Sequence, residues 1–145
     1  MKKINSKLFK ESMSKFATGI TVITINIKNI YIGKTINSFS ALSLNPPLVL
    51  YALDNQSSSL KEYKQSLNIG INILSKKQID ISKYFSNKKP EWKYKNYFLT
   101  KNKIPMINDC VANFVCKKKK IFKQGDHTIF ICEIKEIMID NSKKP

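Results

Sequence analysis

The chain contains a single histidine, His127, a residue type that can transfer protons near neutral pH. It follows Gly125 and Asp126 and precedes a β-branched run, so we expect it at the start of a strand, at the rim of a sheet. A histidine there can bind a nicotinamide carboxamide or act in proton transfer. It can equally serve only to anchor the strand, and the residues alone leave both interpretations open.

Two polar segments have the composition of backbone-lined ligand sites. Gly33 to Ser43 is rich in small hydroxyl and amide residues between two predicted strands, so its N–H groups can reach the polar edge of a planar ring. Asn55 to Ser59 precedes a predicted helix, where free N–H groups and serine hydroxyls can bind a phosphomonoester. A plain turn and ordinary helix capping explain the same residues.

The sequence lacks the motifs of several other catalytic classes. It contains no nucleophile elbow, no H-E-x-x-H and no G-x-G-x-x-G. Its cysteines, Cys110, Cys116 and Cys132, are odd in number and irregularly spaced, so we expect buried thiols in a reducing cytoplasm rather than disulfides or a metal site. A protein with so few catalytic side chains is most simply explained by a cofactor that carries the chemistry.

The positive charge suggests a second function class. All 26 basic residues are lysines, and the formal net charge is +16. We interpret most of this excess as compositional bias on solvated faces, because arginine, the preferred residue for bidentate phosphate and base contacts, is absent. A basic polyanion- or nucleic-acid-binding module stays open as an alternative. No segment approaches the roughly 20 apolar residues of a membrane span, and Lys2 and Lys3 precede no signal-peptide core.

The hydrophobic pattern predicts a mainly β protein with a few short helices. We expect a single domain over residues 1–145, in which the strands form a closed antiparallel barrel.

Two basic segments are expected to lie outside the barrel strands. Lys117–Lys120 is expected to be a turn or an exposed edge, and Asn87–Lys103, which carries Trp92, is expected to be a mobile lid. The predicted strands are Ile20–Ile27, Ile30–Ile32, Leu48–Leu53, Leu67–Leu74, Asp109–Val115 and Thr128–Ile139; the predicted helices are Lys7–Phe16 capped by Ser6, the segment from Ser57–Ser59 to Gln65, and Lys76–Phe85 capped by Ser75.

Three motifs, in order along nearly the whole chain, resemble the flavin reductase-like family of FMN-binding split barrels. They are F-A-T-G-I-T-V-I-T at Phe16–Thr24, T-I-N-S-F-S-A-L-S-L-N-P-P-L-V-L at Thr35–Leu50, and G-D-H-T-I-F at Gly125–Phe130. Gly70–Ser75, Gln78 and Phe85 continue the resemblance in register. The resemblance implies a six-stranded antiparallel split β-barrel with Greek-key-like topology. It also implies a homodimer with flavin at the subunit interface.

The implied activity is flavin reduction. The resemblance implies that the protein binds FMN, or alternatively FAD, and transfers a hydride to it from NADH or NADPH, in some cases supplying a partner monooxygenase. It implies a catalytic position for His127 beside the nicotinamide. The implied flavin-binding residues are Lys34, Thr35, Ile36, Asn37, Ser38, Ser40, Ala41, Asp54, Asn55, Ser57, Ser58, Ser59, Phe85 and Trp92. A non-reductase flavoprotein of the same fold, such as an electron carrier, stays open.

Two departures from the family pattern carry expectations of their own. Lys34 stands where relatives usually have an apolar residue, and its cation either stabilises reduced flavin or points to solvent. The sequence ends at Pro145, where relatives usually continue with an apolar strand. We therefore expect either a fragment or a member that has lost that strand.

Overall fold

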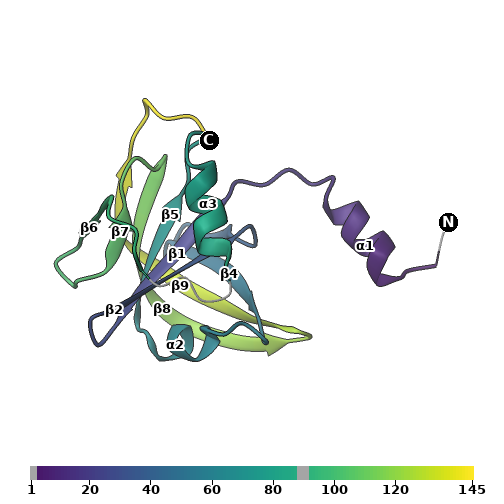
Figure 1. The fold of residues 1–145 in the computed structure, drawn as a ribbon. Coiled ribbons are helices and arrows are strands. Elements are labelled where there is room, and N and C mark those ends of the chain that lie inside the picture. The colour runs from purple at the N-terminus through teal and green to yellow at the C-terminus, as the bar shows by residue number, and fades with distance from the viewer. Residues whose placement is uncertain (1–2, 88–91) are drawn as a thin grey trace.

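The computed structural model describes residues 3–87 and 92–145. Figure 1 shows a body of β-strands from which helix α1 stands apart on an extended segment. The elements are α1 (Ser6–Met13), β1 (Thr21–Ile27), β2 (Ile30–Ile36), β3 (Ser40–Ser43), β4 (Leu48–Asp54), α2 (Leu60–Gln65), β5 (Asn68–Ile73), α3 (Ile79–Ser86), β6 (Tyr97–Leu99), β7 (Pro105–Ile107), β8 (Ala112–Gln124) and β9 (His127–Ile139).

The main sheet has seven strands in the order β2-β1-β5-β8-β9-β4-β3, and every neighbouring pair is antiparallel. The predicted mainly β, antiparallel architecture is confirmed. The prediction of six strands is wrong, because the polar segment Ser40–Ser43 also pairs, with β4. Strand β4 pairs antiparallel with β9, with Asp54 opposite His127, so the loop after β4 adjoins the β8–β9 turn.

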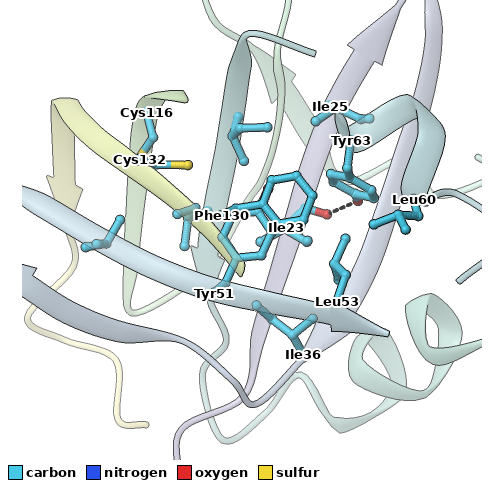
Figure 2. Close-up of a cluster of buried hydrophobic side chains, with 13 residues drawn as sticks. Ile23, Ile25, Ile36, Tyr51, Leu53, Leu60, Tyr63, Cys116, Phe130 and Cys132 are labelled. Carbon is cyan, nitrogen blue, oxygen red and sulfur yellow. Dashed lines mark hydrogen bonds between the residues drawn. The ribbon is translucent and has the colours of Figure 1, made fainter. Parts of the chain in front are cut away.

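Alternating apolar residues in the strands build the core shown in Figure 2. The rings of Tyr51 on β4 and Phe130 on β9 stack with centroids 4.8 Å apart and planes at 5°. The Tyr63 hydroxyl of α2 donates a 2.9 Å hydrogen bond to the backbone oxygen of Ile23. Helix α2 is therefore fixed against the core by a buried aromatic side chain, whose burial alone contributes about 1.5–3 kcal/mol.

Strand β8 differs from the sequence prediction in its length. Lys117–Lys120, expected to form a turn or an exposed edge, lies within β8 and pairs with β9. The long ladder overrides the low strand propensity of lysine. The lysine side chains have partners of two kinds: Lys119 lies 3.2 Å from a carboxylate oxygen of Glu133, and Lys118 donates to the carbonyl oxygens of Tyr63 and Lys64 at the end of α2.

The helices begin and end at residues other than those predicted. Asn5, rather than Ser6, caps α1, since its side chain accepts a 2.9 Å hydrogen bond from the Leu8 N–H. Helix α1 buries none of its residues, and Phe9 and Met13 are 56% and 52% exposed.

Over the described part of the chain, no helix is long and apolar enough to cross a membrane.

The segment expected to be a mobile lid, Asn87–Lys103, contributes one strand to a hairpin. Strand β6 pairs with β7, which follows the segment in the sequence, and the role of the segment as a lid stays a prediction. The hairpin is fastened to the main sheet by buried hydrogen bonds: Thr24 Oγ1 donates to Pro105 O at 2.6 Å, and Asn72 Oδ1 accepts from the Ile107 N–H at 2.9 Å. The part of the predicted lid at 88–91 lies outside the described residues.

Candidate functional site

Asn55, directly after β4, connects the polar segment at 55–59 with the Gly125–Phe130 motif. Its backbone N–H donates to Asp126 O at 2.8 Å, and its side-chain amide donates to Gly125 O at 3.2 Å. Its Oδ1 accepts a 2.7 Å hydrogen bond from Thr128 Oγ1. The polar loop at 54–59 and the Gly125–His127 turn therefore form a single polar region.

Neither Ser57 nor Ser59 of this loop acts as a side-chain helix cap. Ser59 occupies the N-cap position of α2, but its side chain makes no capping hydrogen bond. Ser57 Oγ is buried and has no hydrogen-bond partner among the described residues. A buried hydroxyl without a partner costs free energy unless a ligand or water satisfies it. Ser57 therefore fits a site for a hydrogen-bonding ligand such as a phosphate.

An open groove adjoins the loop along α2. Its volume is about 510 Å³, and its lining includes Asn55, Ser57, Lys61 and Lys64. The two lysines were not among the residues predicted from the sequence. The available signal was that the two lysines stand three residues apart in the predicted helix after the serines, because residues at that spacing share one side of a helix. The charge of these side chains favours an anionic ligand.

His127 is the first residue of β9 and pairs with Asp54 of β4. Its Nδ1 lies 2.7 Å from Asp126 Oδ1, and its side chain is 46% exposed. This hydrogen bond lowers the pKa of the Asp126 carboxyl group. A carboxylate that accepts from Nδ1–H favours the tautomer with Nε2 free to accept a hydrogen bond. Asp126 thus orients the histidine, a role that the sequence prediction did not assign.

The segment from Thr35 to Ala41 is held by its own hydroxyl groups. Thr35 Oγ1 donates to Ser82 O of α3 at 2.7 Å. Ser38 Oγ donates to Ala52 O at 2.8 Å and accepts from the Ala52 N–H at 3.1 Å. Ser40, Ala41 and Asn37 are exposed. These contacts fix the loop between β2 and β3 beside β4.

Two other predicted residues of this segment face the interior of the sheet. The side chain of Ile36 lies in the core, so Ile36 can offer a ligand only its backbone. Lys34 pairs with Ile23 and, two residues from Ile36, lies on the same face of β2. The Lys34 side chain is half-buried. Its exposure is therefore intermediate between that of a cation enclosed beside the flavin and that of a cation in solvent, the two placements expected from the sequence.

Phe85 and Trp92 lie in a different cluster from Asn55 and His127. Phe85 is 1% exposed, and its ring centroid is 5.1 Å from that of Trp92. The cluster packs around α3 against β2, where Gly33 leaves room for the Phe85 ring. The enclosed Phe85 side chain therefore serves packing, and Trp92 is anchored by neighbouring rings rather than held on a free loop.

A family model described as "Flavin reductase like domain" matches residues 13–145. The chain belongs to the flavin reductase-like family. This flavin reductase-like protein is 32% identical over 130 residues to "FMN reductase (NADH) SmoA" of Agrobacterium fabrum, covering 90% of the chain and 75% of that relative. It is 31% identical to "Flavin-dependent monooxygenase, reductase subunit HsaB" of Mycobacterium tuberculosis, covering 98% of the chain and 76% of the relative.

A solved structure gives the same assignment. The flavin reductase-like protein superimposes on "Flavin reductase PheA2 in native state" with a TM-score of 0.87 and 35% sequence identity. The match covers 95% of the chain and 90% of the solved one. This match confirms the resemblance inferred from the sequence motifs. It also confirms that the chain has the fold of the split-barrel flavin reductases.

Proposed function

We propose that this protein is a single-domain NADH- or NADPH-dependent flavin reductase that binds flavin at the polar region formed by Asn55, Ser57 and the Gly125–His127 turn. The observation that carries this assignment is the set of hydrogen bonds from Asn55 to Gly125, Asp126 and Thr128. They bring the expected phosphate loop and the expected nicotinamide residue together on adjacent strands. When bound, flavin accepts the hydride that the nicotinamide cofactor donates.

The chain's own residues supply binding and orientation. Ser57 Oγ has no partner among the described residues, so it is available to donate to the flavin phosphate. Ser58 and Ser59 belong to the same loop and are assigned to the same phosphate. The backbone from Thr35 to Ala41, fixed by Ser38 on β4, is assigned to the flavin ring.

His127 is assigned to the nicotinamide carboxamide. With Nδ1 held by Asp126, the Nε2 atom can accept a hydrogen bond from the carboxamide N–H. Such a contact positions the hydride donor, and positioning is the main contribution that a hydride transfer needs from the protein. No side chain is required to act as a base in this step.

A homodimer is the second part of the proposal. Tyr51 and Phe130 face the core, so their neighbours Leu50, Ile129 and Ile131 face the other side of the sheet. This second face is only half-buried, and Phe122, paired with Ile129, is 48% exposed. An apolar face of this kind favours association with a second copy.

A partner monooxygenase is the third part of the proposal. We propose that the protein passes reduced flavin to such a partner, as the name of the HsaB relative suggests.

The assignment is tested with the purified full chain. We expect absorbance of bound flavin after addition of FMN, oxidation of NADH or NADPH at 340 nm that depends on added flavin, and a dimer by light scattering. Flavin binding without NADH or NADPH oxidation would support the electron-carrier alternative instead. Absence of flavin binding, with salt-sensitive binding to nucleic acid, would support the polyanion-binding alternative.

The proposed location is the cytoplasm. The three free, buried cysteines agree with it, because free thiols persist in a reducing compartment.

A further inference from the structure

Lys118 differs from the other lysines of the run Lys117–Lys120 in its surroundings. Its side chain is half-buried, whereas the other three are exposed. Its ammonium group donates a 3.1 Å hydrogen bond to Tyr63 O and a second hydrogen bond to Lys64 O. Among the described residues, no carboxylate lies within ion-pair distance of it. Lys118 therefore binds the backbone of α2 rather than an acidic side chain.

Helix α2 depends on contacts outside itself for its position. It has six residues, and helices this short are marginal in water without tertiary contacts. Leu60 and Tyr63 anchor one side of it in the core (Figure 2). The last carbonyl groups of a helix have no partners within it, and a cation placed there is stabilising. Lys118 supplies this cation and so fixes the end of α2 on β8.

The start of α2 is continuous with the serine loop of the proposed flavin site. The Leu60 N–H donates to Ser57 O at 3.1 Å, and the Tyr63 N–H donates to Ser59 O at 3.1 Å. Tyr63 thus binds the loop through its N–H and Lys118 through its carbonyl oxygen. A helix of six residues is about 9 Å long, so Lys118 contacts the end of α2 away from the loop and acts on the loop through the helix.

We propose that Lys118 is a positioning residue for the flavin phosphate: it holds the end of α2, and α2 holds Ser57 where its hydroxyl meets the phosphate. The inference rests on the proposed flavin site. Ser57 Oγ is buried without a partner among the described residues, and hydrogen bonds weaken steeply with distance and angle. A small displacement of α2 therefore costs the phosphate contact. Riboflavin has no phosphate, so its binding does not depend on Lys118.

The test compares the affinities of FMN and riboflavin for the full chain and for K118M, whose side chain keeps an apolar stem but donates no hydrogen bond. We expect FMN affinity to fall about three- to tenfold and riboflavin affinity by less than about twofold. K118R keeps the charge and the donors, and should bind FMN within about twofold of the unmodified protein. The matched control is K119M, which removes one positive charge from the next residue and should leave both affinities unchanged. Titration in roughly 0.3 M salt screens the general effect of the lost charge.

Hydrogen exchange of the flavin-free protein reports on the helix directly. The amides of Leu60 and Tyr63 donate to the serine loop, so they should exchange faster in K118M than in the unmodified protein or in K119M. If K118M does not fold, K118Q is measured in the same way, because its shorter side chain removes the charge but stays polar. It should show the same selective loss of FMN affinity.

Several results would overturn the inference. An equal loss of FMN and riboflavin affinity in K118M would mean that Lys118 only stabilises the fold. Unchanged FMN affinity, unchanged exchange of the two amides, or an equal loss of FMN affinity in K118R would also contradict the positioning role. Failure of both flavins to bind the unmodified protein would instead reject the proposed flavin reductase function itself.

Discussion

Thr128 Oγ1 donates a 2.7 Å hydrogen bond to Asn55 Oδ1, joining residues that are 73 positions apart in the sequence. The bond fixes the orientation of the Asn55 amide, because its Oδ1 faces Thr128 and its Nδ2 donates to Gly125 O. Asn55 is assigned to the flavin site, and Thr128 is next to His127. This side-chain pair therefore joins the two halves of the proposed site, together with the hydrogen bonds from Asn55 to Gly125 O and Asp126 O.

Replacement of Thr128 by valine keeps the side-chain shape and removes this hydrogen bond. We expect FMN affinity to fall about two- to tenfold, the equivalent of a lost hydrogen bond of about 0.5–1.5 kcal/mol. The matched control is Thr24→Val, which removes the 2.6 Å hydrogen bond to Pro105 O elsewhere in the sheet. It should lower the melting temperature but leave FMN affinity unchanged in a fluorescence titration. Equal loss of affinity in both variants would contradict the positioning role.

Ser57→Ala should weaken FMN binding without destabilising the free protein. A hydrogen bond to a charged group contributes about 1.5–3 kcal/mol, so we expect FMN affinity to fall at least about tenfold, with riboflavin unaffected. The free variant should melt at the same or a higher temperature, since the buried hydroxyl has no partner among the described residues. Ser66→Ala is the control: it removes a 2.7 Å hydrogen bond to Asn68 O and should lower only the melting temperature. Equal weakening of FMN and riboflavin by Ser57→Ala would reject the phosphate contact.

His127→Ala should raise the KM for the nicotinamide cofactor about two- to tenfold and leave flavin affinity nearly unchanged. A decrease in kcat would show that His127 also orients the hydride donor. Asp126→Ala should give a smaller change in the same direction, because it removes the 2.7 Å contact that holds Nδ1. Both KM values and the melting temperature are measured on one preparation. A lower melting temperature with normal kinetics would show that His127 only anchors β9.

Gly33→Ala should destabilise the protein through the cluster around α3. A Cβ at this position would lie 2.5 Å from two atoms of the Phe85 ring, and that ring is buried. Overpacking of this kind costs about 1–3 kcal/mol, which urea denaturation measures directly. Gly19→Ala is the control, because its Cβ would meet nothing within 4 Å. Equal stability of the two variants would contradict the close packing of Gly33 on Phe85.

We expect the buried thiols to lower the free energy of unfolding at alkaline pH. Burial raises the pKa of Cys110 and Cys132 to about 12 and that of Cys116 further above its usual range. Above a pH of about 8.5 the unfolded chain releases these protons while the folded chain retains them, so stability falls with rising pH. Each thiol contributes a decrease of up to about 1.4 kcal/mol per pH unit.

Urea denaturation between pH 8 and 10 measures this decrease. A variant with Cys116→Ala and Cys132→Ala should be less stable at pH 8, because it loses buried side-chain volume, but should show a shallower dependence on pH. The pH range stops at 10 to limit the effect of Tyr51 and Tyr63, whose pKa values are also raised by burial. An identical pH dependence in the two proteins would exclude the thiols as its cause.

The strands that the sequence predicted correctly are those with a local signal. β1, β4, β5 and β9 have alternating or continuous apolar residues, and the described strands begin within a residue or so of the predicted positions. β3 and the β6–β7 hairpin have no such signal. Their pairing depends on partners distant in the sequence, such as the contact of Thr24 with Pro105, which no local pattern reveals.

The candidate site was predictable at the level of segments rather than side chains. The motifs located the polar loop and the late turn, and the structure brings Asn55 and His127 onto adjacent strands. Which side chains are enclosed depends on tertiary packing: Ile36 lies in the core of the sheet and Phe85 of α3 in the cluster beside β2, and both are buried. Their contact with a ligand stays a prediction. The orienting contact of Asp126 likewise depends on the conformation of the turn.

The order of strands in the sheet has a consequence for how the protein folds. β4 lies beside β9, whose residues follow it by more than half of the chain, so their pairing closes a long loop. For the 73-residue separation between Asn55 and Thr128, the entropic cost of closure is roughly 4 kcal/mol. A nascent chain therefore acquires the proposed flavin site only after β9 has been synthesised. Flavin bound there would favour the fully paired sheet over forms in which β9 is detached, by about 2.7 kcal/mol at a hundredfold excess over Kd. The survival of newly made molecules against proteolysis would then follow the cellular supply of flavin.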